Sequence, residues 1–391
     1  MTNMPSPDSP PATLAGANKL ARLAAVGAIV LAVGTGFAYA GGWFSPRKLT
    51  PARLIDTFEQ INGAHPGFRR NHAKGVCVGG YFESNGQGAR LSKAVVFQPG
   101  KVPVVGRFAL AGGMPYAADA MQTVRSLALR FSLPNGEEWR TGMNSIPVFA
   151  VNTPEAFREQ LLAMAPDPKT GKPALASVKA FLTRHPESAR AIQMIKAQPI
   201  ASGFDNSAFN GLNAFKFVDT TGKSTAVRWS MVPMQPFVPS AAQPPQNDPN
   251  FLFDALVARV KQQPLQWRLV LTIGEPGDST SDATIAWPAD RERVDVGTLT
   301  INQIESEETS PVRAINFDPL VLPNGITGSD DPLLSARSAA YSQSFTRRIG
   351  EPSRVGSPPA SPAAYRRGRA WEPSQGSHIR SSAVISSEVG K

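Results

Sequence analysis

A short polar stretch that leads into a strand-like run of small residues contains the clearest candidate for acid–base chemistry. The sequence has only four histidines, and His72 stands directly before the glycine-spaced, β-type run Gly75–Glu83. An imidazole can accept and return a proton near neutral pH, and glycine removes side-chain bulk where a flat ligand would lie close to the backbone. The same spacing also fits an ordinary polar residue at the start of a strand, so the pattern by itself leaves both interpretations open.

This stretch resembles the distal-histidine segment of the haem catalase superfamily, in which Arg-x-x-His-Ala-Lys-Gly is followed by Gly-Tyr-Phe-Glu. Here the first motif runs from Arg69 through His72 to Gly75, and the second is Gly80–Glu83. Phe68 replaces the acidic or amide residue that usually precedes the arginine. The resemblance implies that His72 is the catalytic distal residue and that Arg69 is one of the residues that hold the haem.

Two further segments resemble sequence segments of the same superfamily, and they follow in the same order along the chain. Arg107 belongs to a segment similar to its Val-Arg-Phe-Ser strand, whose arginine reaches a haem propionate, and Ala109 stands in place of the serine. Asn144 precedes an x-x-Pro-x-Phe pattern, as the distal asparagine does, and Phe157 follows where the family has a phenylalanine near the distal face. Without the resemblance, Arg107 is a solvated strand residue and Asn144 is a residue of a turn or of the start of a strand.

The last third of the chain resembles the superfamily's approach to its proximal haem ligand, which is the tyrosine of an Arg-x-x-x-Tyr motif. Here the pair is Arg337 and Tyr341, and Arg348 follows as the family's further arginine does. An i,i+4 spacing puts the guanidinium and the phenol oxygen on one helix face, and a nearby cation favours the anionic oxygen that ferric iron binds. Ala339 and Gln343 replace an aromatic residue and an aspartate of the pattern. Taken alone, Tyr341 would be a core tyrosine.

Short runs of β-branched and aromatic residues, broken by Asn-Gly, Pro-Gly and Gly-Gly, predict an α+β protein dominated by one antiparallel β-barrel with flanking helices. By resemblance this barrel is of the haem-catalase type. The predicted strands are 76–82, 94–97, 102–109 and 125–133, a hairpin within 215–229, then 267–273 and 294–301. Helices are predicted at 51–61, 155–164, 188–194 and 251–260.

Composition excludes some classes of function. The 391 residues are 41% hydrophobic, which is enough for a substantial core. The net charge is +10, but residues 1–50 and 351–391 are both basic, and the segment between them has no basic stripe interleaved with aromatic residues. Nucleic acid is therefore not an expected partner. Cys77 is the only cysteine, which excludes an intramolecular disulfide and thiolate metal sites of the CxxC type.

The two ends of the chain differ from the middle. After a polar N-terminal segment, 1–22, an apolar Ala/Gly/Val/Leu run at 23–43 is long enough to cross a bilayer, so it is either a signal peptide or a transmembrane anchor. A buried core helix is the alternative. We expect a periplasmic protein, free or anchored in the inner membrane by 23–43. Residues 351–391 are rich in Ser, Pro and Arg and are expected to be a disordered tail.

The resemblance covers 51–350 and implies a catalase-like haem domain that holds haem b (heme b) between His72 and Tyr341, with Tyr341 as the iron ligand. We expect neither the further helical region nor the long N-terminal arm of the large catalases, so the small catalase-related peroxidases of bacteria are the nearest match. The expected function is a haem-dependent peroxidase that reduces hydrogen peroxide or organic hydroperoxides with a small external reductant. A true catalase and a non-enzymatic haem-binding or peroxide-sensing module are the alternatives, and the oligomeric state stays open.

Overall fold

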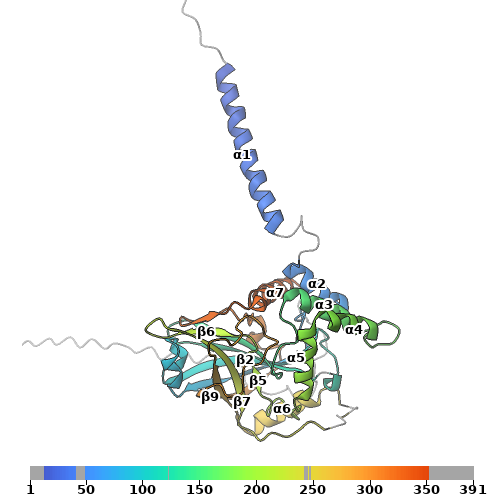
Figure 1. Ribbon diagram of the computed structural model, residues 1–391, viewed down its shortest axis with the longest axis vertical. Coiled ribbons are helices and arrows are strands. Elements are labelled where there is room, and N and C mark those ends of the chain that lie inside the picture. Colours follow the sequence, from blue (N-terminus) through green and yellow to red (C-terminus); the bar gives the residue numbers. More distant parts are fainter. Residues whose placement is uncertain (1–12, 41–48, 122, 242–244, 246–247, 352–391) are drawn as a thin grey trace, which may run out of the picture.

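The computed structural model describes residues 13–40, 49–121, 123–241, 245 and 248–351. One antiparallel β-barrel forms the body of the protein, and three helices gather at one end of it: α2 (Pro51–Asn62), α3 (Pro154–Ala163) and α7 (Pro332–Ile349) (Figure 1). Helix α1 (Thr13–Ala40) extends away from this body as a separate rod (Figure 1).

Eight strands close the barrel, each antiparallel to its neighbours, which confirms the predicted architecture. They are β1 (Gly75–Ser84), β2 (Gly100–Leu110), β3 (Arg125–Ser132), β4 (Glu138–Asn144), β5 (Phe209–Asn210), β7 (Ser224–Pro233), β8 (Leu265–Ile273) and β9 (Arg293–Glu305). The order around the ring is β7-β5-β4-β3-β2-β1-β9-β8, and β8 pairs with β7 again. Two short strands, β6 (Phe215–Val218) and β10 (Ile326–Gly328), extend the sheet beyond β7.

Large side chains fill the inside of the barrel. Phe82, Phe108, Phe131, Trp139 and Trp267 are fully buried there, and the Phe131 and Trp139 rings stack with their centroids 4.8 Å apart. An eight-stranded barrel is just wide enough for its own side chains. A site for a large ligand must therefore lie on the outside of the barrel.

The outer face of β2, β3 and β4 supplies one side of such a site. Successive residues of a strand point to opposite faces, so the neighbours of inward-facing core residues point outward. The outward-facing residues that line the cavity are Arg107 and Ala109 of β2, Ser126 and Ala128 of β3, and Gly142 and Asn144 of β4. Helices α2, α3 and α7 cover this face.

These three helices begin in the same way, with a polar N-cap followed by proline. The Thr50 hydroxyl accepts a hydrogen bond from the Arg53 amide at the start of α2, and Thr153 caps α3 in the same manner. The Asp331 carboxylate accepts from the Leu333 amide at the start of α7. Such caps satisfy amide groups that a helix start leaves unpaired, and they fix where each helix begins relative to the barrel.

The predicted helices at 51–61, 155–164, 188–194 and 251–260 are confirmed as α2, α3, α5 (Pro186–Ala197) and α6 (Phe251–Gln262). Helix α4 (Leu175–Arg184) was not predicted. The predicted strand at 94–97 is wrong, because Val95–Phe97 is a 3₁₀ turn in which Phe97 N donates to Ala94 O. This segment lies beside the end of β6, where the Lys93 amide donates to the Val218 carbonyl, and it buries Phe97 against Trp139 without joining the ladder.

Helix α1 begins ten residues before the predicted apolar span, within the segment that we expected to be polar. Alanine and leucine in that segment are strong helix formers, which explains the extension. The stretch Ala21–Tyr39 is long and apolar enough to cross a membrane, and none of it is buried against the rest of the protein. Residues 41–43 of the predicted span and the predicted tail after residue 351 lie outside the described residues. The domain limits 51–350 stay a prediction.

Candidate functional site

All eight candidate residues line one cavity between the outer face of the barrel and the three helices. They are Arg69, His72, Arg107, Asn144, Phe157, Arg337, Tyr341 and Arg348. The space between its walls is about 1310 Å³ when the solvent at its open mouth is included. Its walls are mainly apolar, and Phe157 of α3 packs between Phe58 of α2 and Phe149, with ring centroids 5.9 and 5.5 Å away.

His72 lies in the loop before β1 and has an uncommon backbone conformation. Its φ is +55°, and among the described residues only one other non-glycine residue, Leu212, has a positive φ. Both residues line the cavity. The Asn71 carboxamide oxygen holds the loop, because it accepts from the amides of His72 (3.0 Å) and Gly112 (2.9 Å). Backbone strain of this kind concentrates at functional sites and persists where neighbouring contacts enforce it.

The His72 imidazole is hydrogen-bonded to the outer face of the barrel. Its Nδ1 lies 3.0 Å from the Ser126 hydroxyl, and that hydroxyl donates to Asn144 Oδ1 at 2.5 Å. Ser126 is the direct cross-strand partner of Asn144 on one side and of Ala109 on the other. We call His72, Ser126 and Asn144 the distal group. Its three members come from three separate segments of the chain.

The distal group is electrically neutral. Removal from bulk water, together with the positive charges of Arg107 and Arg337, lowers the pKa of His72 to about 3, and a hydrogen bond to the Leu110 backbone carbonyl opposes this shift. A positive charge is unfavourable in such a place because burial and nearby cations both disfavour it. The imidazole therefore stays neutral at physiological pH and can act as a proton acceptor.

Tyr341 reaches the cavity from α7 and lies against β4. A side chain at Gly142 would come within 3.3 Å of the Tyr341 hydroxyl and within 3.4 Å of Arg337 Nη2, so glycine leaves the space that both groups occupy. Arg337 donates to the Gly142 carbonyl at 3.1 Å, and its guanidinium carbon is 5.9 Å from the centre of the Tyr341 ring. The predicted neighbourhood of Arg337 and Tyr341 on one helix face is confirmed.

A polar chain anchors Arg337 from behind. The guanidinium donates to Asn213 Oδ1, and Asn213 Nδ2 donates to the Asp331 carboxylate at 2.7 Å. Asp331 also caps α7, and burial raises the pKa of its carboxyl group. We call Tyr341, Arg337, Asn213 and Asp331 the proximal group. Since one carboxylate both starts the helix and holds this chain, the rotation of α7 and the position of Arg337 are set together.

The remaining three candidates form an arginine cluster at one end of the cavity: Arg69, Arg107 and Arg348. A single carboxylate lies among them, Glu307, which is 2.7 Å from Arg107 and 3.5 Å from Arg69. Burial and neighbouring guanidiniums lower the pKa of Arg69 to about 10 and that of Arg348 to about 9, so both stay protonated at neutral pH. Arg348 Nη1 and Nη2 are buried without a hydrogen-bond partner. The cluster therefore carries an excess of positive charge.

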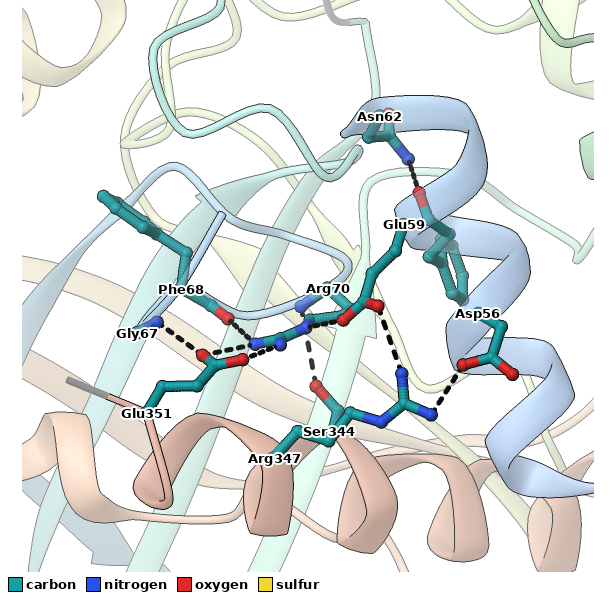
Figure 2. A network of polar contacts seen from close by, with 10 residues as sticks. Asp56, Glu59, Asn62, Gly67, Phe68, Arg70, Ser344, Arg347 and Glu351 are labelled. Carbon is teal, nitrogen blue, oxygen red and sulfur yellow. Dashed lines mark hydrogen bonds and ion pairs between the residues drawn. The ribbon is translucent and has the colours of Figure 1, made fainter. Parts of the chain in front are cut away.

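Arg69 and Arg70 are adjacent in the sequence, and the motif alone did not show which of the two faces the cavity. In the structure their roles differ. Arg70 points away from the cavity and lies between Glu59 of α2 and Glu351, just after α7 (Figure 2). Its guanidinium also donates to the Phe68 carbonyl at 2.9 Å. Arg347 extends the network from α7 to Glu59. These ion pairs join two of the three covering helices, α2 and α7, to the loop that carries His72.

Sequence reasoning missed Ser126, Asn213 and Glu307. All three are residue types that are common on surfaces and in turns, so the type alone does not indicate a function. The role of each is visible only from the partner that it contacts in the structure. Alternation within β3 places Ser126 on the same face as Ala128, which is a weak signal, whereas nothing in the sequence connects Asn213 with Arg337. Among the described residues, no group of three His, Cys, Asp or Glu side chains is arranged to hold a metal ion. A metal held through Tyr341 would have to arrive with most of its ligands.

Comparison with known proteins gives a consistent result. The family model Catalase matches residues 42–363. A catalase-related peroxidase of Synechococcus elongatus is 37% identical over 332 residues, which cover 85% of this chain and 97% of that protein. A catalase-related peroxidase of Mycolicibacterium paratuberculosis is 32% identical over 314 residues, with coverages of 80% and 98%.

The full-length catalases are more distant. The chain is 28% identical to the catalase of Sus scrofa over 294 residues and spans 56% of that protein's length. Among solved structures, catalase A from Saccharomyces cerevisiae shares the fold with a TM-score of 0.66 at 19% identity, covering 78% of this chain and 66% of that one. A bacterial catalase has a TM-score of 0.64 at 22% identity, with coverages of 78% and 62%. From the family match, the two peroxidase relatives and the shared fold, we conclude that this chain belongs to the catalase family.

Proposed function

We propose that the protein is a haem-dependent peroxidase that reduces hydrogen peroxide or an organic hydroperoxide with a small external reductant. The observation that carries the proposal is the convergence, in one mainly apolar cavity, of a neutral histidine, a tyrosine beside an arginine, and an arginine cluster in which the terminal nitrogens of Arg348 have no hydrogen-bond partner. The two relatives that match over nearly their whole length are both catalase-related peroxidases.

The residues of the cavity fit haem b. Its two propionates are anionic, and the arginine cluster with Glu307 has two positive charges in excess. The unpaired nitrogens of Arg348 offer parallel N–H donors of the kind that bind a carboxylate. Aromatic and aliphatic side chains of α2 and α3 form walls suited to a flat macrocycle. Tyr341 would hold the iron through its phenol oxygen, as tyrosine does in catalases.

When bound, ferric haem would supply the metal centre and two electrons for cleavage of the peroxide O–O bond, and the external reductant would return those electrons. His72 would accept the peroxide proton and return it to the oxygen that leaves. Asn144 orients the leaving oxygen by hydrogen bonding. Proton transfer by a placed side chain typically contributes about 10²–10⁴-fold to the rate, and it requires the neutral imidazole that the cavity maintains. Arg337 keeps a positive charge beside the Tyr341 oxygen and thereby favours the anionic ligand.

The deciding experiment compares two activities of the purified full-length chain reconstituted with haem. A Soret band should appear, and oxidation of an aromatic dye driven by an alkyl hydroperoxide should exceed oxygen release from hydrogen peroxide alone. Vigorous oxygen release with negligible dye oxidation would instead identify a catalase. Protein that stays colourless after addition of hemin would overturn the haem site, and haem binding without peroxide turnover would indicate a sensor.

We further propose that α1 delivers the domain to the periplasm and either tethers it to the inner membrane or is removed on export. The apolar stretch Ala21–Tyr39 supports this, because its length suits a bilayer and nothing in the described structure covers it. Cell fractionation together with the mass of the mature protein tests the proposal. Recovery of the intact chain in the soluble cytoplasmic fraction would contradict it.

A further inference from the structure

We infer that Ser126 is a positioning residue that sets the hydrogen-bonding direction of both His72 and Asn144, so that the first presents a proton acceptor to the cavity and the second a proton donor. The catalytic meaning of this inference rests on the proposed peroxidase function. The geometry is independent of it, because one serine hydroxyl joins the two side chains.

The Ser126 hydroxyl has a single proton, so it can donate only one hydrogen bond. Its oxygen lies 2.5 Å from the Asn144 carboxamide and 3.0 Å from His72 Nδ1. The Asn144 atom at this separation is Oδ1, and 2.5 Å lies within the range of about 2.5–3.0 Å for O–H···O hydrogen bonds. An amide oxygen only accepts, so Ser126 donates its proton to Asn144.

The direction of the Ser126–Asn144 hydrogen bond determines which nitrogen of the His72 imidazole carries the proton. Since the Ser126 proton is used, the 3.0 Å contact with His72 Nδ1 is a hydrogen bond only when Nδ1 carries the imidazole proton, and we assign the proton there. A neutral imidazole has one N–H and one lone pair, and the partner of one nitrogen decides the state of the other. The lone pair of His72 is therefore on Nε2. Because Ser126 occupies the Asn144 oxygen, the two N–H groups of Nδ2 are the part of that amide left to act as donors.

A proton acceptor at His72 and a proton donor at Asn144 match the hydrogen-bonding groups of a hydroperoxide. The substrate class has an acidic O–H and oxygen atoms that accept hydrogen bonds. His72 Nε2 can take the proton, and Asn144 Nδ2 can donate to an oxygen. If either side chain reversed its direction, the cavity would present two donors or two acceptors instead. A single hydroxyl thus enforces the polarity of both groups.

Ser126 lies beside a position where this chain departs from the superfamily pattern. The superfamily pattern has a serine on the preceding strand, where this chain has Ala109. Ala109 and Ser126 are direct cross-strand partners on β2 and β3, and both line the cavity. Paired residues project to the same face of a sheet. The hydroxyl that is missing at Ala109 is therefore supplied from the neighbouring strand.

A competing arrangement also exists. The backbone carbonyl of Leu110 accepts a hydrogen bond from the His72 imidazole, and it would remain if Ser126 were replaced. If that carbonyl alone fixed the histidine, the serine would be dispensable for His72. The experiment must therefore separate the two acceptors.

The test compares variants of the full-length haem protein. Ser126→Ala should retain haem and lose about 10- to 100-fold in kcat, the usual cost of losing the partner that orients a functional histidine. The KM for the reducing dye should not change. Ser126→Ala combined with Ala109→Ser returns a hydroxyl to the same face from β2 and should recover most of the loss. Ser230→Ala is the matched control, because Ser230 likewise donates to an asparagine oxygen across a strand pair, at 2.6 Å from Asn210 Oδ1, and does not line the cavity.

A second readout does not depend on activity. With only four histidines in the chain, ¹⁵N-histidine NMR of the haem-free full-length protein can report which His72 nitrogen carries the proton. The wild type should show N–H at Nδ1 only, and Ser126→Ala should show a mixture of tautomers. An unchanged tautomer in Ser126→Ala together with wild-type kcat would overturn the inference and assign the role to Leu110. Loss of activity that Ala109→Ser does not recover, with the tautomer unchanged, would also overturn it.

The same measurements distinguish this inference from the proposed function. If the wild type binds haem and turns over no peroxide, the proposed function fails, whereas the tautomer shift between wild type and Ser126→Ala still decides whether Ser126 positions His72. If peroxidase activity is present and the tautomer is unaffected, the function stands and the inference fails.

Discussion

The distal group of the cavity is linked by neutral hydrogen bonds between barrel strands and the His72 loop, whereas the proximal group connects the charged Arg337 through the Asn213 amide to the Asp331 carboxylate at the start of helix α7. Ser126 and Asn144 are held in register by two strands that share a full ladder. Arg337 is instead held through Asn213 by the carboxylate that caps the helix. The two groups thus face one cavity from supports of different kinds.

The difference corresponds to two kinds of task. A residue that shuttles a proton must change its protonation state easily, so a neutral setting with a directional partner suits His72. A residue that holds an anionic oxygen on a metal needs a permanent positive charge nearby, and arginine keeps its charge at all physiological pH values. The paired strands fix the directions of the distal hydrogen bonds, and helix α7 places the positive charge of Arg337 beside Tyr341. Four predictions test this division.

Replacement of the Tyr341 hydroxyl should have the largest effect. Tyr341→Phe removes the only candidate metal ligand, so the protein should lose most of its haem and its peroxidase activity should fall to that of the haem-free chain. The haem-to-protein ratio from absorbance checks this. Tyr116→Phe, at a side chain that is 52% exposed, is the matched control. Full haem occupancy in Tyr341→Phe would show that the proximal group does not hold the metal.

The distal group should affect rate and leave haem binding unchanged. His72→Ala should reduce turnover about 10²–10⁴-fold, because it removes the proton acceptor, while the Soret band persists. Steady-state kinetics at saturating peroxide provide the measurement. His65→Gln serves as control, since His65 lies in the preceding loop, contacts the Asn62 carbonyl and is not part of the cavity. Turnover equal to wild type would remove His72 from the mechanism.

The ion-pair network that joins the His72 loop to α2 and α7 should contribute to the stability of the folded protein. The Arg70 side chain is 5% exposed and bridges Glu59 and Glu351, so Arg70→Met should lower the free energy of unfolding by about 3 kcal/mol, near the lower end for a broken buried ion pair. Arg347→Met, at a more exposed position of the same network, should cost about 1 kcal/mol or less. Urea unfolding monitored by tryptophan fluorescence compares them. Equal losses would mean that burial of Arg70 is not what makes its pairs strong.

The last prediction concerns the pH dependence of stability. The pKa of His72 is about 3 in the folded protein and about 6.5 when unfolded, so between these values the unfolded chain binds one more proton. Stability should therefore fall as the pH falls from 6.5 towards 3, by at most about 1.4 kcal/mol per unit from this residue. His72→Gln should remove that part of the slope in the haem-free chain. An unchanged slope would show that His72 is protonated in the folded state.

Much of the architecture follows from local patterns. Alternating apolar residues predict the long strands, and polar caps followed by proline mark the starts of the helices over the cavity. These signals act within a few residues, so they are visible in the chain alone. The segment 94–97 shows their limit: its residues favour a strand, but the segment forms a turn that buries Phe97 against Trp139 in the barrel core.

For the cavity, the sequence alone indicated the residues whose types are rare or whose spacing is specific, such as His72 and the Arg337–Tyr341 pair. Only the tertiary structure decided that Arg69 faces the cavity while Arg70 faces the ion network. It also brought Ser126 beside His72, 54 residues apart in sequence. The physical reason is that strand register and helix docking determine which side chains meet. A serine or an asparagine acquires its role from the partner it meets, and that partner is set by packing over the whole barrel.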